Sequence, residues 1–276
     1  MNDELKFTVI SDIHYYSKKN FVDGFDKNKK PKPGQLFFSR SEEIVEHTFD
    51  CLCKNDTPDI VLISGDLTYN GERTSHDEMK AALKKLQQNG KRVYVITATH
   101  DYTTPRMPTY GIDKNDKYIE VESVKRTQLL KYYGDFGYNN AIAKHKSTMS
   151  YVAQLADGYR LFALNDDYGD PDCGFSDELM NWVKTEANNA KRDGQYIIAM
   201  THHPLVPPSP IYTAVAKGDM LNEYELRRKQ LSDLGFDFVL TGHTHMHNIS
   251  YCKIGNKKFY DISTAALTDR KSTRLN

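Results

Sequence analysis

The hydrophobic pattern of the chain contains five short apolar runs, and each run gives way abruptly to polar residues. The runs lie at residues 7–10, 60–63, 93–96, 197–200 and 238–240. A buried parallel strand is apolar on both faces, and the sequence turns polar where the chain leaves the sheet. The pattern therefore predicts parallel strands with polar side chains at their carboxyl ends. In open α/β sheets this is the edge at which ligands bind.

Helical and hairpin patterns connect and follow these runs. Ser39 and Ser75, each with a glutamate three residues later, predict capping boxes at the starts of two helices. Further helices are predicted over 122–133, from Ser176 onward and over 223–234, and hairpins over 150–165 and 247–263. Early β-α-β units followed by hairpins indicate one α/β domain of two packed mixed sheets flanked by helices. Loops are predicted over 15–38, 102–121 and 205–222, and we expect substrate specificity to lie in them.

Composition narrows the class of protein. The 276 residues carry 37 Lys and Arg and 37 Asp and Glu, so the net charge is zero and no global field favours nucleic acid or an anionic membrane. The four cysteines form no C-x-x-C pair, which favours reduced thiols over disulfides or a zinc site. The acidic start and the lack of a long apolar run predict a cytoplasmic protein without a membrane partner.

The end of the chain differs from the rest. Residues 269–276 do not continue the preceding strand pattern. We therefore expect a domain over 1–268, a non-native tail over 269–276, and a natural C-terminus that extends beyond the present one.

The polar residues after the apolar runs are metal-binding types. Carboxylates and imidazoles together favour Zn, Mn or Fe over Mg or Ca. The candidate ligands are Asp12, His14, Asp66, His202, His243 and His245. Six ligands exceed the four of one tetrahedral ion, so two ions sharing Asp66 are predicted. Two ions roughly 3.5–4 Å apart form the arrangement that hydrolyses phosphoesters.

Each motif also has an ordinary structural explanation. Asp66 after a glycine is typical of a turn, and His202-His203-Pro204 is compatible with a packed loop. Asn165–Asp167 either lines the cleft or forms a turn. Tyr15, Tyr16 and Tyr102 either stack on a ligand or pack under loops. The remaining histidines are predicted at the surface, namely His47, His76 and His145. The five motifs together, each after a predicted strand, favour the metal site.

Taken in order, the motifs resemble those of the calcineurin-like metallophosphoesterases. They are Asp12-Ile13-His14, Gly65-Asp66, Ala98-Thr99-His100-Asp101, His202-His203-Pro204 and Gly242-His243-Thr244-His245. The His-His-Pro form, and Gly174 ahead of a helix containing Trp182, are most similar to the class III cyclic nucleotide phosphodiesterase branch. The resemblance implies a four-layer α/β/β/α sandwich.

The resemblance also implies a role for each motif residue. One ion would be held by Asp12, His14, Asp66 and His245, and the other by Asp66, His202 and His243. A hydroxide bridging the ions would attack phosphorus. His100, steered by Asp101, would protonate the leaving oxygen. His203 either contacts the substrate or packs behind the ligands.

One position departs from the family pattern. Thr99 and Ala98 stand where the family has asparagine and glycine, and a hydroxyl is a poorer ligand than an amide oxygen. Thr99 is therefore either a weak ligand of the second ion or a residue that supports the ligands.

The leading hypothesis is a dinuclear phosphoesterase acting on small phosphodiesters or monoesters. A nuclease of the same superfamily would need a basic track, for which Lys18–Lys32 is the candidate. A non-catalytic metal-binding protein on the same scaffold is motivated by Thr99 alone. The oligomeric state is not predicted by any pattern in the sequence.

Overall fold

A small parallel sheet is built from the first three apolar runs. The computed structural model describes residues 4–22, 38–54, 56–105, 107–115, 117–167 and 173–268. The strands are β1 (Phe7–Ile10), β2 (Ile60–Ser64) and β3 (Arg92–Ile96), in the order β1-β2-β3. Both neighbouring pairs are parallel. All five residues of the central strand β2 are buried, which explains its unbroken apolar sequence.

The remaining runs and both hairpins form a larger mixed sheet. Its strands follow the order β11-β12-β10-β9-β8-β7-β6. The central strands β8, β9, β10 and β12 are parallel to one another, β11 and β7 run antiparallel to them, and β6 pairs antiparallel with β7. The bounds are β6 (Ala143–His145), β7 (Ser150–Ala156), β8 (Tyr159–Ala163), β9 (Tyr196–Met200), β10 (Phe238–Thr241), β11 (Asn248–Ile254) and β12 (Lys257–Ser263). Two short strands, β4 (Gly111–Ile112) and β5 (Tyr118–Ile119), pair separately.

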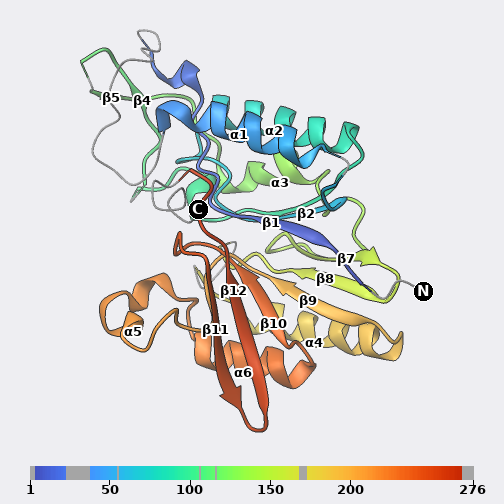
Figure 1. The fold of residues 1–276 in the computed structure, drawn as a ribbon. Helices are drawn as coiled ribbons and strands as arrows, with labels where there is room; N and C mark the ends of the chain where they lie inside the picture. Colours follow the sequence, from blue (N-terminus) through green and yellow to red (C-terminus); the bar gives the residue numbers. More distant parts are fainter. Residues whose placement is uncertain are drawn as a thin grey trace.

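Helices cover the outer face of each sheet, which confirms the predicted four-layer sandwich (Figure 1). The helices over the first sheet are α1 (Ser41–Leu52), α2 (Arg73–Gln88) and α3 (Leu129–Tyr133). Those over the second are α4 (Asp177–Arg192) and α6 (Tyr224–Leu234), with the short α5 (Tyr212–Val215) to one side. Short 3₁₀ helices lie at Lys18–Asn20, Phe38–Arg40, Thr99–Asp101, Arg126–Gln128 and Lys217–Asp219.

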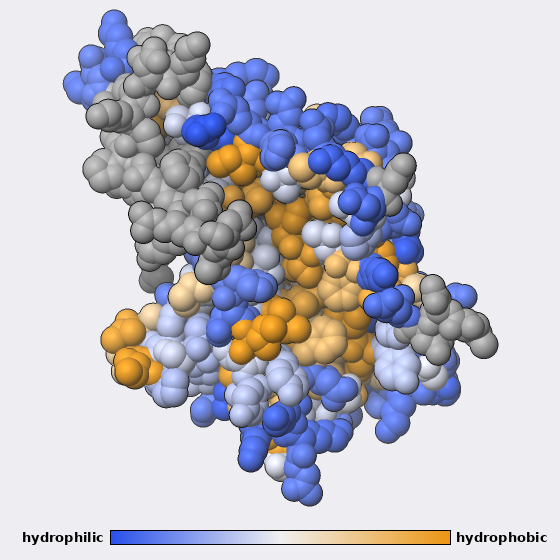
Figure 2. Space-filling view, in the orientation of Figure 1, coloured by the Kyte–Doolittle hydropathy of each residue, from blue (hydrophilic) through white to orange (hydrophobic). Residues whose placement is uncertain are grey.

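Two hydrophobic cores hold the layers together. The first contains side chains from the inward faces of α1 and α2, such as Phe49 and Leu83, together with side chains from the strands of the small sheet. The second lies between the large sheet and α4 and α6, around Phe162 and Val183. On the face shown in Figure 2, apolar side chains form a band between the α1–α2 layer and the β11–β12 hairpin. The carboxyl ends of β1, β2, β9 and β10 are therefore held by packed layers on both sides.

Several helix starts differ from the sequence predictions. Helix α1 begins at Ser41 and α2 at Arg73, and neither cap residue makes a side-chain capping bond, so both predicted capping boxes are wrong. The hydroxyl of Ser75 instead accepts the backbone N–H of Ser17 at 3.1 Å. Ser176 does cap α4, as predicted, by accepting the N–H of Leu179. Of the predicted helix over 122–133, only α3 is α-helical. The predicted tail 269–276 and residues 23–37 of the first loop lie outside the described residues.

Candidate metal centre

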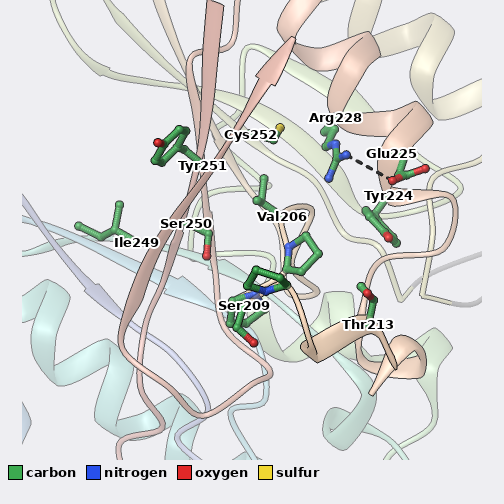
Figure 3. Close-up of a pocket in the computed structure, with 13 residues that line it drawn as sticks. Val206, Ser209, Thr213, Tyr224, Glu225, Arg228, Ile249, Ser250, Tyr251 and Cys252 are labelled. Carbon is green, nitrogen blue, oxygen red and sulfur yellow. Dashed lines mark hydrogen bonds and ion pairs between the residues drawn. The ribbon is translucent and has the colours of Figure 1, made fainter. Parts of the chain in front are cut away.

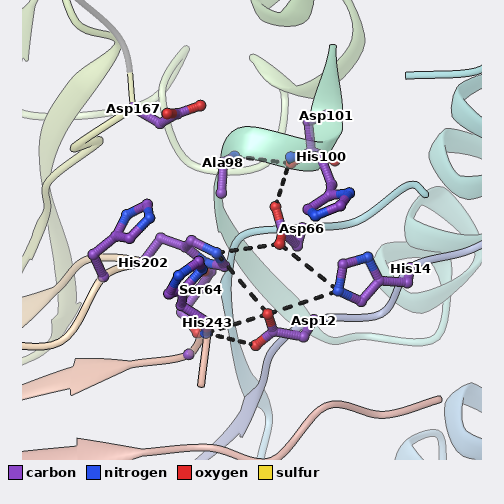
Figure 4. A network of polar contacts seen from close by, with 12 residues as sticks. Asp12, His14, Ser64, Asp66, Ala98, His100, Asp101, Asp167, His202 and His243 are labelled. Carbon is purple, nitrogen blue, oxygen red and sulfur yellow. Dashed lines mark hydrogen bonds and ion pairs between the residues drawn. The ribbon is translucent and has the colours of Figure 1, made fainter. Parts of the chain in front are cut away.

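The predicted metal ligands converge between the two sheets at the carboxyl ends of their strands (Figure 4). Their ligand atoms form two groups in which every atom lies within 4.8 Å of the others: Asp12, His14 and His245; and Asp66, His202 and His243. A further group joins His14 and Asp66 to His100. Residues up to 233 positions apart in sequence thus meet at one place, as the ends of neighbouring parallel strands allow.

The backbone is left-handed at five of the six predicted ligands. The φ angles are 49° at Asp12, 45° at His14, 53° at Asp66, 64° at His243 and 57° at His245. A non-glycine residue in this region costs of order 1–3 kcal/mol, and such residues cluster at functional sites. Backbone hydrogen bonds hold the chain in this conformation, for example the bond from Asp12 N–H to Gly65 O at 3.1 Å. The strain shows that the fold maintains an unfavourable local conformation to bring these side chains together.

The glycines before Asp66 and His243 allow close approach of neighbouring groups. A Cβ on Gly242 would lie 2.6 Å from Asp12 Oδ2 and would overlap Ser11 Oγ. A Cβ on Gly65, where φ is +103°, would lie 2.8 Å from His202 Nδ1. Any larger residue would therefore displace a ligand. This is the physical reason for glycine in both motifs.

Two members of the first group, Asp12 and His14, have the protonation states that a metal ion requires. His14 Nε2 lies 3.8 Å from Asp12 Oδ1 and 3.1 Å from His245 Nε2. Burial lowers the pKa of His14 to about 3. Burial alone would raise the pKa of Asp12, but His245 and His202 outweigh it and lower that pKa to about 2. A neutral imidazole beside an ionised carboxylate is the state that binds a metal.

The second group favours positive charge between His202 and Asp66. His202 Nδ1 lies 2.8 Å from the carbonyl oxygen of Ser64, and a hydrogen bond there leaves Nε2 to face Asp66 Oδ2 at 3.2 Å. Nε2 is buried and has no hydrogen-bond partner. Burial would lower the pKa of His202, but Asp66 and Asp12 hold it well above its usual value. A cation bound between the two side chains would satisfy both the orphaned nitrogen and the carboxylate.

His100 lies beside the site but is oriented differently from the prediction. Its backbone N–H donates to Asp66 Oδ1 at 2.9 Å. Its Nδ1 lies 2.6 Å from the carbonyl oxygen of Tyr69 and 2.8 Å from Asn70 Oδ1, so these neutral acceptors hold the ring. Asp101, expected to steer His100, instead accepts the backbone N–H groups of Thr68 and Ala98, each at 2.9 Å. The carboxylate points back into the turn because it stabilises the backbone there. Burial and the nearby Asp66 raise the pKa of Asp101 to about 8.

Asp166, whose role the sequence left open, supports the turn that carries His202 and His203. Its Oδ2 accepts the backbone N–H groups of His203 at 2.7 Å and His202 at 3.2 Å, and the hydroxyl of Thr201 at 2.8 Å. The same oxygen lies 3.3 Å from His203 Nδ1. Burial would raise the pKa of Asp166, but His203 and His202 lower it, so the carboxylate is ionised. The one signal in the sequence was a carboxylate directly after a predicted strand.

His203 lies behind a predicted ligand. Its side chain is buried, and its ring centroid is 4.1 Å from that of His243. This position fits the packing interpretation of His203, and its contact with substrate stays a prediction. Thr99 is half-buried at the start of the 3₁₀ helix that carries His100.

Comparison with known proteins identifies the family of this chain. The family model described as calcineurin-like phosphoesterase matches residues 5–247. The chain belongs to the calcineurin-like phosphoesterase family. The predicted family and enzyme class are thereby confirmed: the protein is a metal-dependent phosphoester hydrolase of a dinuclear family. No curated protein sequence matches the chain significantly.

Solved structures share the fold of this phosphoesterase. A dimetal phosphatase from Danio rerio aligns with a TM-score of 0.65 at 12% identity, covering 95% of this chain and 88% of that one. A phosphopantetheinyl hydrolase from Mycobacterium tuberculosis aligns at 12% identity over 99% and 94% of the two chains, with a TM-score of 0.46. At this identity the first similarity establishes the fold alone, and the second is too weak to carry an argument. Among the described residues, no helix combines the length and apolarity needed to cross a membrane.

Two histidines predicted at the surface are buried in the phosphoesterase, so these predictions were wrong. His76 contacts the Tyr133 hydroxyl through Nδ1 at 2.6 Å and the Asp101 carbonyl oxygen through Nε2 at 3.0 Å. His76 thus supports the turn that carries His100. His145 is buried beside Trp182. His47 is exposed, as predicted. Tyr15, Tyr16 and Tyr102 are buried, which favours packing over ligand stacking.

A separate groove lies away from the metal ligands. It is bounded by β11, the start of α6 and the loop Val206–Pro210 (Figure 3). Arg228 within it pairs with Glu225 at 3.4 Å. Within the described part of the chain, none of the predicted site residues lines this groove. The predicted site residues therefore lie outside this groove.

Proposed function

We propose that this protein hydrolyses small phosphodiesters or phosphomonoesters at a centre of two Mn, Fe or Zn ions. Asp12, His14, Asp66 and His245 would hold one ion, and Asp66, His202 and His243 the other. The observation that carries this proposal is the position of Asp66. Its Oδ2 lies 3.7 Å from His14 Nε2 and 3.2 Å from His202 Nε2, between the two groups of ligands.

The residues fit such ions by their chemistry. Imidazole and carboxylate donors suit Mn, Fe and Zn, and the buried Nε2 of His202, which makes no hydrogen bond, faces the carboxylates of Asp12 and Asp66. When bound, two ions would supply Lewis-acid chemistry, lowering the pKa of water and neutralising the charge that develops on the phosphoryl group. His14 is neutral and Asp12 ionised before any ion arrives, so neither of these two ligands has to lose a proton on binding.

His100 is the candidate proton donor to the leaving oxygen. Tyr69 and Asn70 engage its Nδ1, which leaves Nε2 for the substrate. The Asp66 carboxylate accepts the backbone N–H of His100 and so fixes the position of that residue. The same residue would thus position both ions and the acid, so that the reacting groups keep one geometry.

The nuclease alternative is less favoured by the charges around the site. Lys18 pairs with Glu42 and Lys19 with Glu78, each at 3.0 Å, so the described part of the basic track is neutralised. Residues 23–32 of that track lie outside the described residues. The resemblance to the class III phosphodiesterase branch supports a diester as the first substrate to test.

Turnover of bis-p-nitrophenyl phosphate and p-nitrophenyl phosphate tests the proposal. We expect the metal-free protein to be inactive, and added Mn²⁺ to restore hydrolysis as two ions bind per chain. Elemental analysis of the same samples gives the metal content. Two bound ions without turnover of either ester would contradict the proposal and favour a non-catalytic metal-binding protein.

A further inference from the structure

A run of three tyrosines leads from the metal ligands to the protein surface. We call Tyr69, Tyr110 and Tyr118 the tyrosine run. The ring of Tyr69 lies 6.1 Å from that of His100, at an angle of 33°, and 6.4 Å from that of His14. The ring of Tyr110 lies 6.1 Å from Tyr69 and 4.1 Å from Tyr118. Tyr69 and Tyr110 are half-buried and Tyr118 is 58% exposed, so the run reaches solvent.

Buried contacts fix the tyrosine run in place. The ring of Tyr16, which is 1% exposed, lies edge-on to Tyr69 at 5.9 Å. The Tyr16 hydroxyl donates to the carbonyl oxygen of Tyr110 at 3.0 Å, and the Tyr110 hydroxyl donates to that of Tyr69 at 3.3 Å. Aromatic rings held by packing and hydrogen bonds lose little further freedom when a ligand stacks on them. The run is therefore a preformed aromatic surface.

The location of the run points to the leaving group. His100 is the candidate proton donor, so the leaving oxygen and the group attached to it would lie on the His100 side. The opposite side, around His203 and His243, is lined by imidazoles backed by the Asp166 carboxylate. Planar rings favour offset or edge-to-face contacts with other rings at about 4.5–7 Å. On the second side the His203 ring is buried against His243, whereas the tyrosine run extends to the exposed ring of Tyr118, so the run is the more accessible aromatic surface.

We propose that the tyrosine run binds a planar aromatic group on the leaving side of the substrate, and so makes the enzyme selective for phosphoesters of aromatic or heteroaromatic alcohols. The inference rests on the proposed function, since it assumes that the phosphoryl group binds at the metal centre. Tyr69 and Tyr110 are the specificity-determining residues, and Tyr118 extends the surface outward.

Matched phosphonates test this inference by binding rather than by turnover. Phenylphosphonate and methylphosphonate carry the same anionic head, with and without a ring. Calorimetric titration of the Mn²⁺-loaded protein should show phenylphosphonate binding about tenfold more tightly, which corresponds to ~1.4 kcal/mol. In Tyr69→Leu and in Tyr110→Leu the affinity ratio should fall toward one, with methylphosphonate affinity unchanged. Tyr69→Phe, which keeps the ring, should retain the ratio.

Tyr196→Leu is the matched control. Tyr196 lies on strand β9, outside the tyrosine run, and its exposed ring stacks on that of Tyr159 with 5.4 Å between the ring centroids. It should leave the ratio as in wild type. Equal affinity for the two phosphonates in wild type, failure of both to bind, or an unchanged ratio in both leucine variants overturns the inference. Ester turnover without any phosphonate preference would overturn it while the proposed function stands. A tyrosine-dependent ratio without ester turnover would instead refute the proposed function and the ester selectivity that rests on it, but would leave the tyrosine run as a binding site for an aromatic group.

Discussion

The two histidine-bearing turns of the site, 201–204 after β9 and 98–101 after β3, are built in contrasting ways. In the first, an ionised carboxylate from the adjacent strand, Asp166, accepts hydrogen bonds from the turn and lies against the His203 ring. In the second, the carboxylate belongs to the turn itself, and neutral acceptors orient the His100 ring. His202 and His203 are buried, whereas His100 is partly exposed.

The contrast fits the role that we propose for each histidine. A metal ligand has to keep its position and have its charge balanced, which a buried anion behind the turn achieves. A group that meets the substrate has to be reachable, and neutral acceptors fix its tautomer without surrounding it. Asp66 joins the two turns, because one carboxylate oxygen faces His202 and the other accepts the N–H of His100.

The largest effect is expected for Asp66→Ala, which removes the group common to both turns. We expect activity to be abolished and the metal content to fall at both positions, because each ion loses a ligand. Activity and elemental analysis of the purified variant measure this. Near-wild-type activity would contradict the assignment of a shared ligand.

Asp166→Ala should affect the first turn strongly and the second little. It leaves two buried N–H groups and a hydroxyl without their acceptor, so the free energy of unfolding should fall by about 2–4 kcal/mol. We expect the second ion to bind at least tenfold more weakly in Mn²⁺ titrations, with a smaller effect in Asp166→Asn, which keeps an oxygen acceptor.

Asp261→Asn is the control for Asp166. The Asp261 carboxylate is also buried and accepts the N–H groups of Leu205 and Val206, just beyond the histidines. This variant should destabilise the protein in urea unfolding but retain the wild-type Mn²⁺ affinity. Unaltered Mn²⁺ affinity in Asp166→Ala would refute a specific role of Asp166 in the metal centre.

Asn70→Ala should affect the second turn alone. The His100 ring loses its side-chain acceptor but keeps the Tyr69 carbonyl, so we expect kcat to fall about tenfold, a part of the roughly 10²–10⁴-fold that a general acid contributes. The metal content should equal that of wild type. A lowered metal content with unchanged kcat per bound ion would show that the two turns are not functionally separate.

Thr99→Asn should have the smallest effect and the opposite direction. An amide oxygen is a better neutral ligand than a hydroxyl, so the second ion should bind more tightly, and a tenfold gain would equal ~1.4 kcal/mol. If a water or a neighbouring side chain already completes the coordination, the affinity stays the same. Mn²⁺ titration of the metal-free wild type and variant decides between these outcomes.

The strands and the candidate metal ligands could be predicted from the sequence alone. A buried parallel strand must be apolar throughout and must end where a polar residue appears, so the runs before Asp12, Asp66 and His202 could be identified directly. The glycines of the motifs were equally visible, and their reason, close approach to Asp12 and His202, became clear from the coordinates.

Tertiary structure alone decided how the ligands are supported. The Asp166 and His203 positions are 37 residues apart, and the contact depends on β8 lying beside β9, which no local pattern encodes. The same holds for the burial of His76 under the His100 turn and for the start of α2, where Ser75 binds the loop at Ser17. Local periodicity specifies which face of an element is apolar, but the partner of a buried polar group depends on which elements become neighbours when the sheets pack.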